Sequence, residues 1–335
     1  MDNVAKLSSH DRKDLFYETS VKMKTTPAIV EKDFWVVWVL DKIFSDDFFK
    51  NIFMFKGGTS LSKVYDLIGR FSEDIDLILD WREVIDENPN KQRASKNQQV
   101  KFNERVNKLT LSYINEKLLP IISGLVSPLC ECEIDKNNPF NINIKYPSIF
   151  EDNYLRPLIL LEIGPLASWL PFDKFNIQSY ASQYFPDIFK KAKCDVYAIV
   201  AKRTFWEKAT ILHQEFHRVQ EKSLPLRYSR HYYDLAIMAK SPVKDEALSD
   251  MQLLKEVVEF KKKFYPSAWA NFDEAKQGTL KLVPPNYRLK QLQKDYQAMG
   301  GMIFSKKLSF DEIIEILTEL EKDINNPYKR QKIGK

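Results

Sequence analysis

The chain has 335 residues, of which 44% are hydrophobic, 13% aromatic and 29% charged, and its formal net charge is +5. These values fit a soluble enzyme that buries at least one large core. No apolar run is long enough to span a bilayer, and three cysteines are too few for a disulfide framework or a zinc module. The N-terminus lacks the basic and apolar regions of a signal peptide, so we expect a cytoplasmic protein.

The first part of the chain mixes predicted helices and strands. Apolar periodicity predicts helices over residues 10–24, 28–44 and 100–118. Residues 52–80 are predicted as strand, helix and strand, and further strands are expected at 142–146, 158–163 and 193–201. From Phe205 onward helical periodicity dominates, with prolines between the helical segments. The pattern indicates an α/β (α+β) fold followed by a helical C-terminal domain.

A double-glycine turn follows the strand that starts at residue 52. Gly57 and Gly58 allow a close approach of the backbone to another group. Either Thr59 or Ser60 can cap a helix over residues 60–68, and phosphate can bind at such a helix N-terminus. A double glycine is common by itself, so we weigh it only together with the acidic strand that comes next.

Two carboxylates lie in that next strand. Asp74 and Asp76 alternate with Ile75, Leu77 and Leu79, which predicts a half-buried strand with both acids on one face. Two carboxylates a few ångströms apart repel each other unless one takes a proton or a cation binds both. Mg²⁺ typically takes one or two protein carboxylates and completes its shell with phosphates and water. The pair therefore predicts a site for Mg²⁺, or Mn²⁺ in its place, that can hold a triphosphate.

One further acidic residue interrupts an apolar run. Glu162 lies within residues 157–164, which otherwise have the composition of a buried strand. A single acid in such a run is costly unless it is paired or binds a metal. We predict that Glu162 is a third metal ligand or a general base, and a satisfied structural glutamate is the alternative.

The C-terminal half contains a lysine beside a predicted helix start. Thr204 and Glu207 match the capping-box pattern, so a helix should begin near Phe205. Lys208 then lies next to apolar residues in the first turns of that helix. An ammonium in this position can hold phosphate oxygens as a point charge.

A second helix carries an acid and a base four residues apart. Ser229 can cap this helix, on which Arg230 and Asp234 face the same side. From the residues alone the simpler interpretation is an ordinary helix ion pair, which contributes about 0.3–0.5 kcal/mol.

Two histidines four apart, His213 and His217, do not form a zinc protease motif. Such a motif needs a glutamate directly after the first histidine, and here Glu215 comes one position later. We predict that both are histidines on a helix surface.

Basic residues also cluster in two stretches, where they either bind RNA phosphates or only solubilise the surface. The first stretch has Lys91, Arg93, Lys96, Lys101, Arg105 and Lys108, and the second has Lys329, Arg330, Lys332 and Lys335.

The run from Phe55 to Leu77 resembles the signature of the DNA polymerase beta-like nucleotidyltransferase superfamily. More specifically, it resembles the AbiEii/AbiGii nucleotidyltransferase toxins of bacterial toxin–antitoxin and phage-defence systems. Three further segments extend the likeness: residues 29–36 (IVEKDFWV), 204–209 (TFWEKA) and 230–235 (RHYYDL). The chain departs from the family in a slightly longer gap between Gly58 and Asp74, and in His231, where the family often has aspartate.

The resemblance implies a polymerase-beta-like mixed sheet flanked by helices, in three parts. Residues 1–50 would be N-terminal helices that pack on the core, 51–202 the catalytic domain, and 203–335 a helical domain that completes the active site. The implied reaction is metal-dependent transfer of a nucleotide from a nucleoside triphosphate to an acceptor, here RNA at the 3′ end of tRNA. The result would be growth arrest or abortive infection, with a separately encoded antitoxin as partner.

The resemblance also implies a role for each motif. The expected metal ligands are Asp74, Asp76 and Glu162, and the expected catalytic residues are these three with Lys208 and Asp234. The expected nucleotide-binding residues are Lys56, Gly57, Gly58, Thr59, Ser60, Arg70 and Ser72. Two alternatives stay open: an enzyme of the same fold that modifies protein or transfers a phosphate, and a nucleotide- or RNA-binding regulator without turnover.

Overall fold

The chain forms two compact units in the computed structural model, which describes residues 1–152, 155–166, 170–304 and 307–326. The sheet unit comprises Met1–Tyr65 and Phe71–Ile199. The helical unit comprises Asp66–Arg70 and the residues from Val200 onward. Residues 1–50 therefore belong to the same unit as the sheet, and a short segment before the acidic strand belongs to the other unit.

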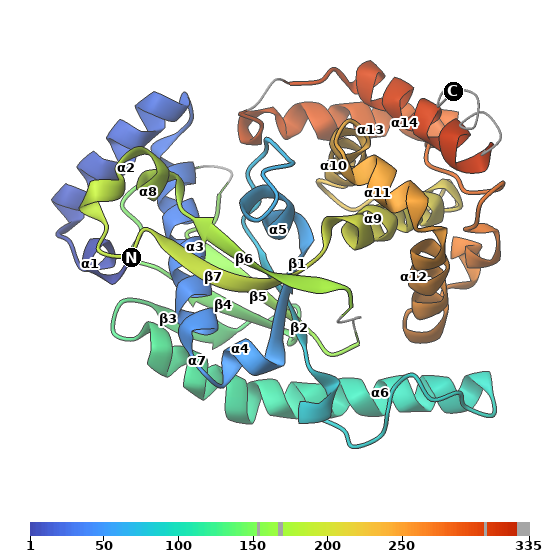
Figure 1. Ribbon diagram of the computed structural model, residues 1–335, viewed down its shortest axis with the longest axis horizontal. Helices are drawn as coiled ribbons and strands as arrows, with labels where there is room; N and C mark the ends of the chain where they lie inside the picture. Colours follow the sequence, from blue (N-terminus) through green and yellow to red (C-terminus); the bar gives the residue numbers. More distant parts are fainter. Residues whose placement is uncertain (153–154, 167–169, 305–306, 327–335) are drawn as a thin grey trace. The chain divides into compact units, whose positions relative to one another are not determined.

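The sheet unit is built on seven strands in the order β3-β4-β5-β2-β1-β7-β6 (Figure 1). The strands are β1 Phe53–Lys56, β2 Ile75–Leu79, β3 Glu131–Ile134, β4 Asn141–Lys145, β5 Leu158–Gly164, β6 Phe172–Gln178 and β7 Lys193–Ile199. β2 pairs with β5 and β1 with β7 in parallel, whereas β1–β2, β3–β4, β4–β5 and β6–β7 are antiparallel. The predicted mixed sheet is confirmed.

The two faces of the central strands have different neighbours. Ile75, Leu77 and Leu79 point into the main core of the sheet unit. Ile78 joins a smaller apolar cluster with Met54 and Ile199 on the opposite face. Successive side chains of a strand alternate between faces. Asp76 therefore shares the face of the smaller cluster and points away from the main core.

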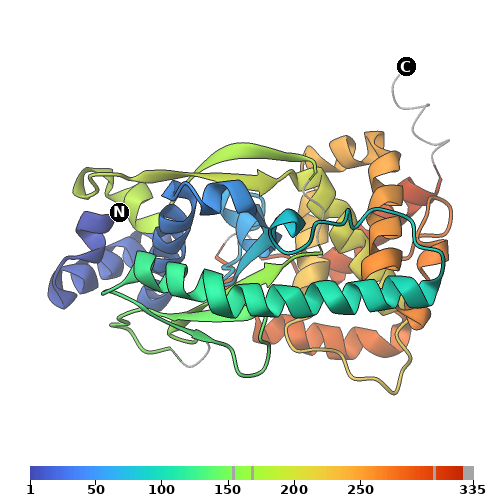
Figure 2. The same ribbon diagram turned by 90° about the horizontal axis from the view of Figure 1, so that it is seen from below.

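The helices of the sheet unit are α1 Asp2–Ala5, α2 Ser9–Met23, α3 Pro27–Ser45, α4 Phe49–Ile52, α5 Gly57–Lys63, α6 Lys96–Tyr113, α7 Leu119–Val126 and α8 Tyr180–Tyr184. All of them except α5 and α6 contribute buried apolar side chains to the main core. α3 starts with Pro27 in its first turn, and the Thr26 hydroxyl caps it by accepting from the backbone N–H of Ile29. α6 continues through a π-helical segment, Ile114–Leu118, into α7 as one long helical stretch (Figure 2).

The helical unit contains the elements that follow β7. They are α9 Ala201–Phe216, α10 Ser229–Ala239, α11 Val243–Ser249, α12 Met251–Phe264, α13 Asn286–Ala298 and α14 Phe310–Asn325. This confirms the predicted helical C-terminal region. α14 begins with a complete capping box between Ser309 and Glu312. In the part of the chain that the structure describes, no helix combines the length and the apolar character needed to cross a membrane.

Candidate active site

The turn between β1 and α5 brings a glycine against a carboxylate. Gly57 has a φ of +83°, a conformation that side-chain-bearing residues rarely adopt. A Cβ on Gly57 would lie 1.7 Å from Oδ2 of Asp76. Both the backbone conformation and the contact with Asp76 therefore require glycine here. Lys56, the residue before the turn, is opposite Asp76 in the β1–β2 register.

Two of the predicted metal ligands are neighbours on adjacent strands. Asp76 on β2 is in direct register with Glu162 on β5, and the two strands are parallel. Neighbouring strands lie about 4.7–4.9 Å apart, and paired residues point to the same face. The side chains of Asp76 and Glu162 are both half-buried. The sheet thus places two carboxylates side by side, next to the glycine turn.

Asp74 lies one residue before β2, and its backbone carbonyl accepts a hydrogen bond from the Thr59 hydroxyl. The Ser60 hydroxyl donates to the carbonyl of Gly57 at 2.9 Å. Both hydroxyl groups are buried, and each spends its single donor on the backbone. The predicted helix over 60–68 with Thr59 or Ser60 as its cap is wrong, because α5 begins at Gly57 and contains both residues. Their hydroxyls stabilise the turn.

The carboxylates of this unit fit a divalent cation that also binds substrate. Among the described residues, no three or more His, Cys, Asp or Glu side chains form a group able to hold a metal ion. The described residues therefore do not supply a complete set of metal ligands by themselves. Mg²⁺ usually needs only one or two carboxylates, since phosphate and water complete its shell. The Asp76–Glu162 pair has the donor chemistry for such a cation.

A buried ionic cluster lies in the helical unit around Asp234. Both Oδ atoms of Asp234 accept from Arg70, at 2.7 Å from Nε and 2.8 Å from an Nη. Lys208 Nζ donates to the same carboxylate at 2.7 Å. Asp234 is 0% exposed, Arg70 4% and Lys208 7%. Asp234 therefore holds two cations in fixed positions, and the Arg230–Asp234 helix ion pair considered from the sequence is not the arrangement that forms.

Arg70 reaches this cluster from the short segment Asp66–Arg70. A β-bridge links Arg70 to Ile303, and the N–H of Phe304 donates to the carbonyl of Gly69 at 3.0 Å. Of the expected nucleotide-binding residues, Arg70 thus belongs to the helical unit. Ser72 belongs to the sheet unit, where it lies half-buried.

The electrostatics of the cluster stabilise the ionised form of Asp234. Burial alone would raise the pKa of Asp234, but Arg70 and Lys208 outweigh it and hold that pKa well below its usual range. Burial lowers the pKa of Lys208, and the Asp234 carboxylate opposes this shift. His231 lies with Nδ1 at 3.2 Å from Lys208 Nζ. Burial and the adjacent cations keep the pKa of His231 well below its usual value, so the neutral ring can accept from the ammonium.

Two predicted helix caps in this unit are wrong. α9 begins at Ala201, so Thr204 lies inside the helix and does not start it. Ser229 is the first residue of α10, and its hydroxyl donates to Asp295 at 2.6 Å. The capping pattern is short and also occurs within helices, which explains the first error.

The prediction of surface histidines is wrong for His213, which is 0% exposed. Its Nε2 lies 3.0 Å from the carbonyl of Asn271, and its Nδ1 accepts from the N–H of Lys281 at 3.0 Å. Both ring nitrogens are thus used, which leaves neither for a metal. Burial lowers the pKa of His213, so the ring is neutral.

The first basic stretch is partly neutralised. Arg93 and Arg105 both contact Glu87, at 3.3 and 2.7 Å, and both guanidinium groups lie over the ring of Phe102. These two arginines are therefore engaged within the protein. Lys101 remains exposed. The second stretch, residues 329–335, lies outside the described residues.

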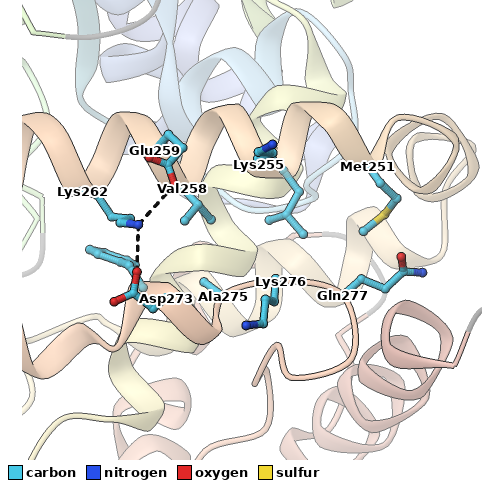
Figure 3. Close-up of a pocket in the computed structure, with 11 residues that line it drawn as sticks. Met251, Lys255, Val258, Glu259, Lys262, Asp273, Ala275, Lys276 and Gln277 are labelled. Carbon is cyan, nitrogen blue, oxygen red and sulfur yellow. Dashed lines mark hydrogen bonds and ion pairs between the residues drawn. The ribbon is translucent and has the colours of Figure 1, made fainter. Parts of the chain in front are cut away.

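A separate pocket of about 330 Å³ lies between α12 and residues 272–277 (Figure 3). Its wall includes Met251 and Val258, and Lys262 contacts Glu259 at 3.3 Å and Asp273 at 2.8 Å. None of the predicted site residues lines this pocket, so it is distinct from the candidate active site.

Three buried charges on α3 have no counterpart in the predicted site. Glu31, Lys32 and Asp33 are consecutive and nearly inaccessible to solvent. The same argument that singled out Glu162, a charge in an apolar run, applies to them. It would have identified them from the sequence.

A mixed sheet with paired carboxylates beside a glycine turn, followed by a helical unit with a buried lysine–aspartate cluster, defines a nucleotidyltransferase. The family model described as "Nucleotidyl transferase AbiEii toxin, Type IV TA system" matches residues 38–316, and the chain belongs to this family. The resemblance inferred from the sequence motifs is thereby confirmed.

A comparison with solved structures also gave matches. JHP933 from Helicobacter pylori has 13% sequence identity and a TM-score of 0.42, with 92% of this chain and 97% of that chain covered. MenT4, a nucleotidyltransferase toxin from Mycobacterium tuberculosis, has 14% identity and a TM-score of 0.43, with 96% of each chain covered. No curated protein sequence matched.

Proposed function

We propose that this toxin-family nucleotidyltransferase is metal dependent and transfers a nucleotide from a nucleoside triphosphate to the 3′ end of tRNA. The observation that carries the metal dependence is the direct register of Asp76 with Glu162 beside Gly57. An RNA acceptor suits a toxin, because a nucleotide added to a tRNA 3′ end blocks aminoacylation. Such a block would arrest growth, and a separately encoded antitoxin would then be needed to protect the cell.

In the proposed reaction the acceptor hydroxyl attacks the α-phosphorus, a P–O bond forms, and the bond to pyrophosphate breaks. Asp76 and Glu162 would hold Mg²⁺ or Mn²⁺ with Asp74 close by in the chain. The bound metal would supply charge neutralisation at the attacking and leaving oxygens. Lys208 would neutralise phosphate oxygens. Asp234 is fully buried and bound to Lys208 and Arg70, so we assign it the role of a positioning residue for these cations.

The test is a labelling experiment with purified protein, total tRNA, Mg²⁺ and each α-³²P-labelled nucleoside triphosphate in turn, resolved for RNA and protein. Asp76→Ala is the loss-of-function variant. Asp195→Asn is the matched control, because this exposed acid on β7 of the same sheet contacts Lys174, at 2.7 Å, and Asn176, at 2.9 Å, which are themselves exposed. We expect label in RNA with the wild type and the control, and none with Asp76→Ala or after chelation with EDTA.

Other outcomes of the experiment lead to other functions. Label in protein would replace RNA by a protein acceptor, and transfer from γ-labelled but not α-labelled triphosphate would indicate phosphorylation. Growth arrest that survives Asp76→Ala would indicate a binding protein without turnover. We further propose action in the cytoplasm and a role in phage defence. The role in phage defence is tested by expressing the wild type and Asp76→Ala in phage-infected cells with and without the antitoxin, and the location by fractionating the same cells.

A further inference from the structure

α3 carries three consecutive buried charges that bind three different parts of the sheet unit. Glu31 is 1% exposed, Lys32 2% and Asp33 0%. Consecutive residues of a helix point in directions about 100° apart, so they reach different neighbours. A buried charge is costly unless it is compensated, and each of these has an opposite charge or a hydrogen bond far away in the sequence.

The two acids of this group hold segments outside the helix. Glu31 accepts from the backbone N–H groups of Ile149, at 2.8 Å, and Phe150, at 3.1 Å. Asp33 accepts from the N–H of Tyr180 at 2.7 Å and forms an ion pair with Lys63, the last residue of α5. α3 is therefore a common support for the turn helix α5 and for the loop between β4 and β5.

Lys32 contacts the segments before the two strands of the candidate active site. Its Nζ donates to Glu73 at 2.5 Å and to the carbonyl of Arg156 at 3.0 Å. Glu73 lies two residues before β2, and Arg156 lies two residues before β5. Because β2 and β5 are parallel, their N-terminal ends lie at the same edge of the sheet. One ammonium thus ties together the segments that lead into the two strands carrying Asp76 and Glu162.

Neither segment lies within a regular strand, although the Thr59 hydroxyl also holds the carbonyl of Asp74. Residues 71–74 precede the β2 ladder, and Arg156 precedes that of β5. A metal-binding pair of carboxylates needs its ligands held within about 0.5 Å. Side-chain ties to a rigid, buried helix are a direct means of achieving this.

We propose that Lys32 is a positioning residue for the transfer reaction, which sets the spacing of Asp76 and Glu162 through its contacts with Glu73 and Arg156. This inference rests on the proposed metal-dependent function. Changes of outer groups that orient metal ligands typically weaken metal affinity by about 10–100-fold. The Lys32–Glu73 pair acts on the ligands through the backbone, so we expect the lower part of that range.

The direction in which metal affinity changes distinguishes a positioning role of Lys32 from a purely electrostatic one. An ammonium repels a divalent cation, so its loss would tighten metal binding if only through-space electrostatics mattered. Loss of positioning weakens binding instead. The double variant Lys32→Met/Glu73→Met leaves the net charge unchanged and removes both members of this ion pair together. Its effect on metal affinity therefore reports on geometry.

The matched control is a second ion pair of the same helix. Lys191 contacts Asp41 on α3 at 2.5 Å, and Lys191 precedes β7, which carries none of the predicted metal ligands. The variant Asp41→Asn/Lys191→Met removes this pair. Asp76→Ala is the positive control for lost metal binding.

The experiment measures Mn²⁺ binding from the electron paramagnetic resonance signal of free Mn²⁺, with thermal melts to confirm folding. We expect the Mn²⁺ dissociation constant to rise about tenfold or more in Lys32→Met/Glu73→Met and to change less than about twofold in the Asp41/Lys191 control. If the double variant does not fold, Lys32→Gln/Glu73→Gln, which keeps hydrogen-bonding groups at both positions, is judged by the same criterion.

Two results would overturn the inference, and they are distinguishable. If a folded double variant binds Mn²⁺ as tightly as the wild type or more tightly, and the wild type transfers label normally, the positioning role of Lys32 is refuted. The proposed function then still stands. A wild type that neither binds Mn²⁺ nor transfers label overturns the proposed function, and the role of Lys32 with it.

Discussion

Replacing Asp234 by asparagine should strongly destabilise the helical unit. The carboxylate accepts hydrogen bonds from Arg70, at 2.7 and 2.8 Å, and from Lys208, at 2.7 Å. An asparagine keeps the shape but removes the charge, so two buried cations lose their counter-ion. Breaking a buried ion pair in this way costs about 3–5 kcal/mol. With a urea dependence of about 1–3 kcal/mol per molar, the unfolding midpoint should fall by at least about 1 M.

The assay is urea unfolding of the wild type and Asp234→Asn, with Asp273→Asn as the matched control. Asp273 pairs with Lys262 at 2.8 Å in the same unit, but its side chain is 82% exposed, so we expect a loss below about 1 kcal/mol. Equal midpoints for Asp234→Asn and the wild type would refute the reasoning, because they would mean that the cluster contributes nothing to folding.

The pH dependence gives a second check on Asp234. Its pKa in the folded protein is depressed, since the cations outweigh burial. The stabilisation is therefore fully present above the unfolded carboxyl pKa of about 4 and is lost as the pH falls below that value. The difference in stability between wild type and Asp234→Asn should narrow from pH 4 to pH 2. A difference that stays constant over this range would contradict the assignment.

Three further predictions follow from the site and its surroundings. Gly57→Ala should reduce nucleotide transfer in the labelling assay at least about 100-fold, because the new Cβ displaces the Asp76 carboxylate. Gly124→Ala is the control and should leave transfer unchanged, because a Cβ there meets no atom within 4 Å. Lys208→Met should lower kcat/KM for the triphosphate by about 100-fold, measured in the same assay. His213 is neutral with a lowered pKa, so wild-type stability to urea should decline below about pH 6.5 as the unfolded state takes up a proton, and His213→Gln should flatten that decline.

Much of the central sheet could be predicted because its strands differ clearly in composition. Asp74 and Asp76 alternate with Ile75 and Leu77 at the start of β2, and β5 is almost continuously apolar. The sequence therefore indicates Asp76 and Glu162 separately as candidate ligands. It does not predict that they lie in direct register, because strand pairing is a long-range property that no local pattern contains.

Two strands were missed for the opposite reason. β3 (Glu131–Ile134) and β6 (Phe172–Gln178) are at the two edges of the sheet and are largely exposed. β3 alternates exposed and half-buried residues over only four positions, and β6 has two adjacent charges, Asp173 and Lys174, so neither shows a long apolar run or a sustained alternation. Local sequence patterns cannot distinguish them from loops.

The partner of Asp234 could not be predicted locally either. The sequence indicated Arg230, one helical turn away, because residues four apart share a helix face. The fold instead supplies Arg70, which is 164 residues away in the chain. A buried acid pairs with whichever cation the tertiary structure brings to it, and burial was not visible from the helix pattern.

The position of Arg70 in the sequence also determines when its ion pair can form during synthesis of the protein. Arg70 leaves the ribosome 164 residues ahead of the carboxylate that it binds in the finished fold. At 5–20 residues per second, that interval is roughly 8–33 s. Until Val200 is made, the segment Asp66–Arg70 belongs to a unit whose remaining residues do not yet exist. A nascent chain that stops before Asp234 therefore holds the acidic strand but cannot form the ion pair between Arg70 and Asp234, so this pair can form only late in synthesis.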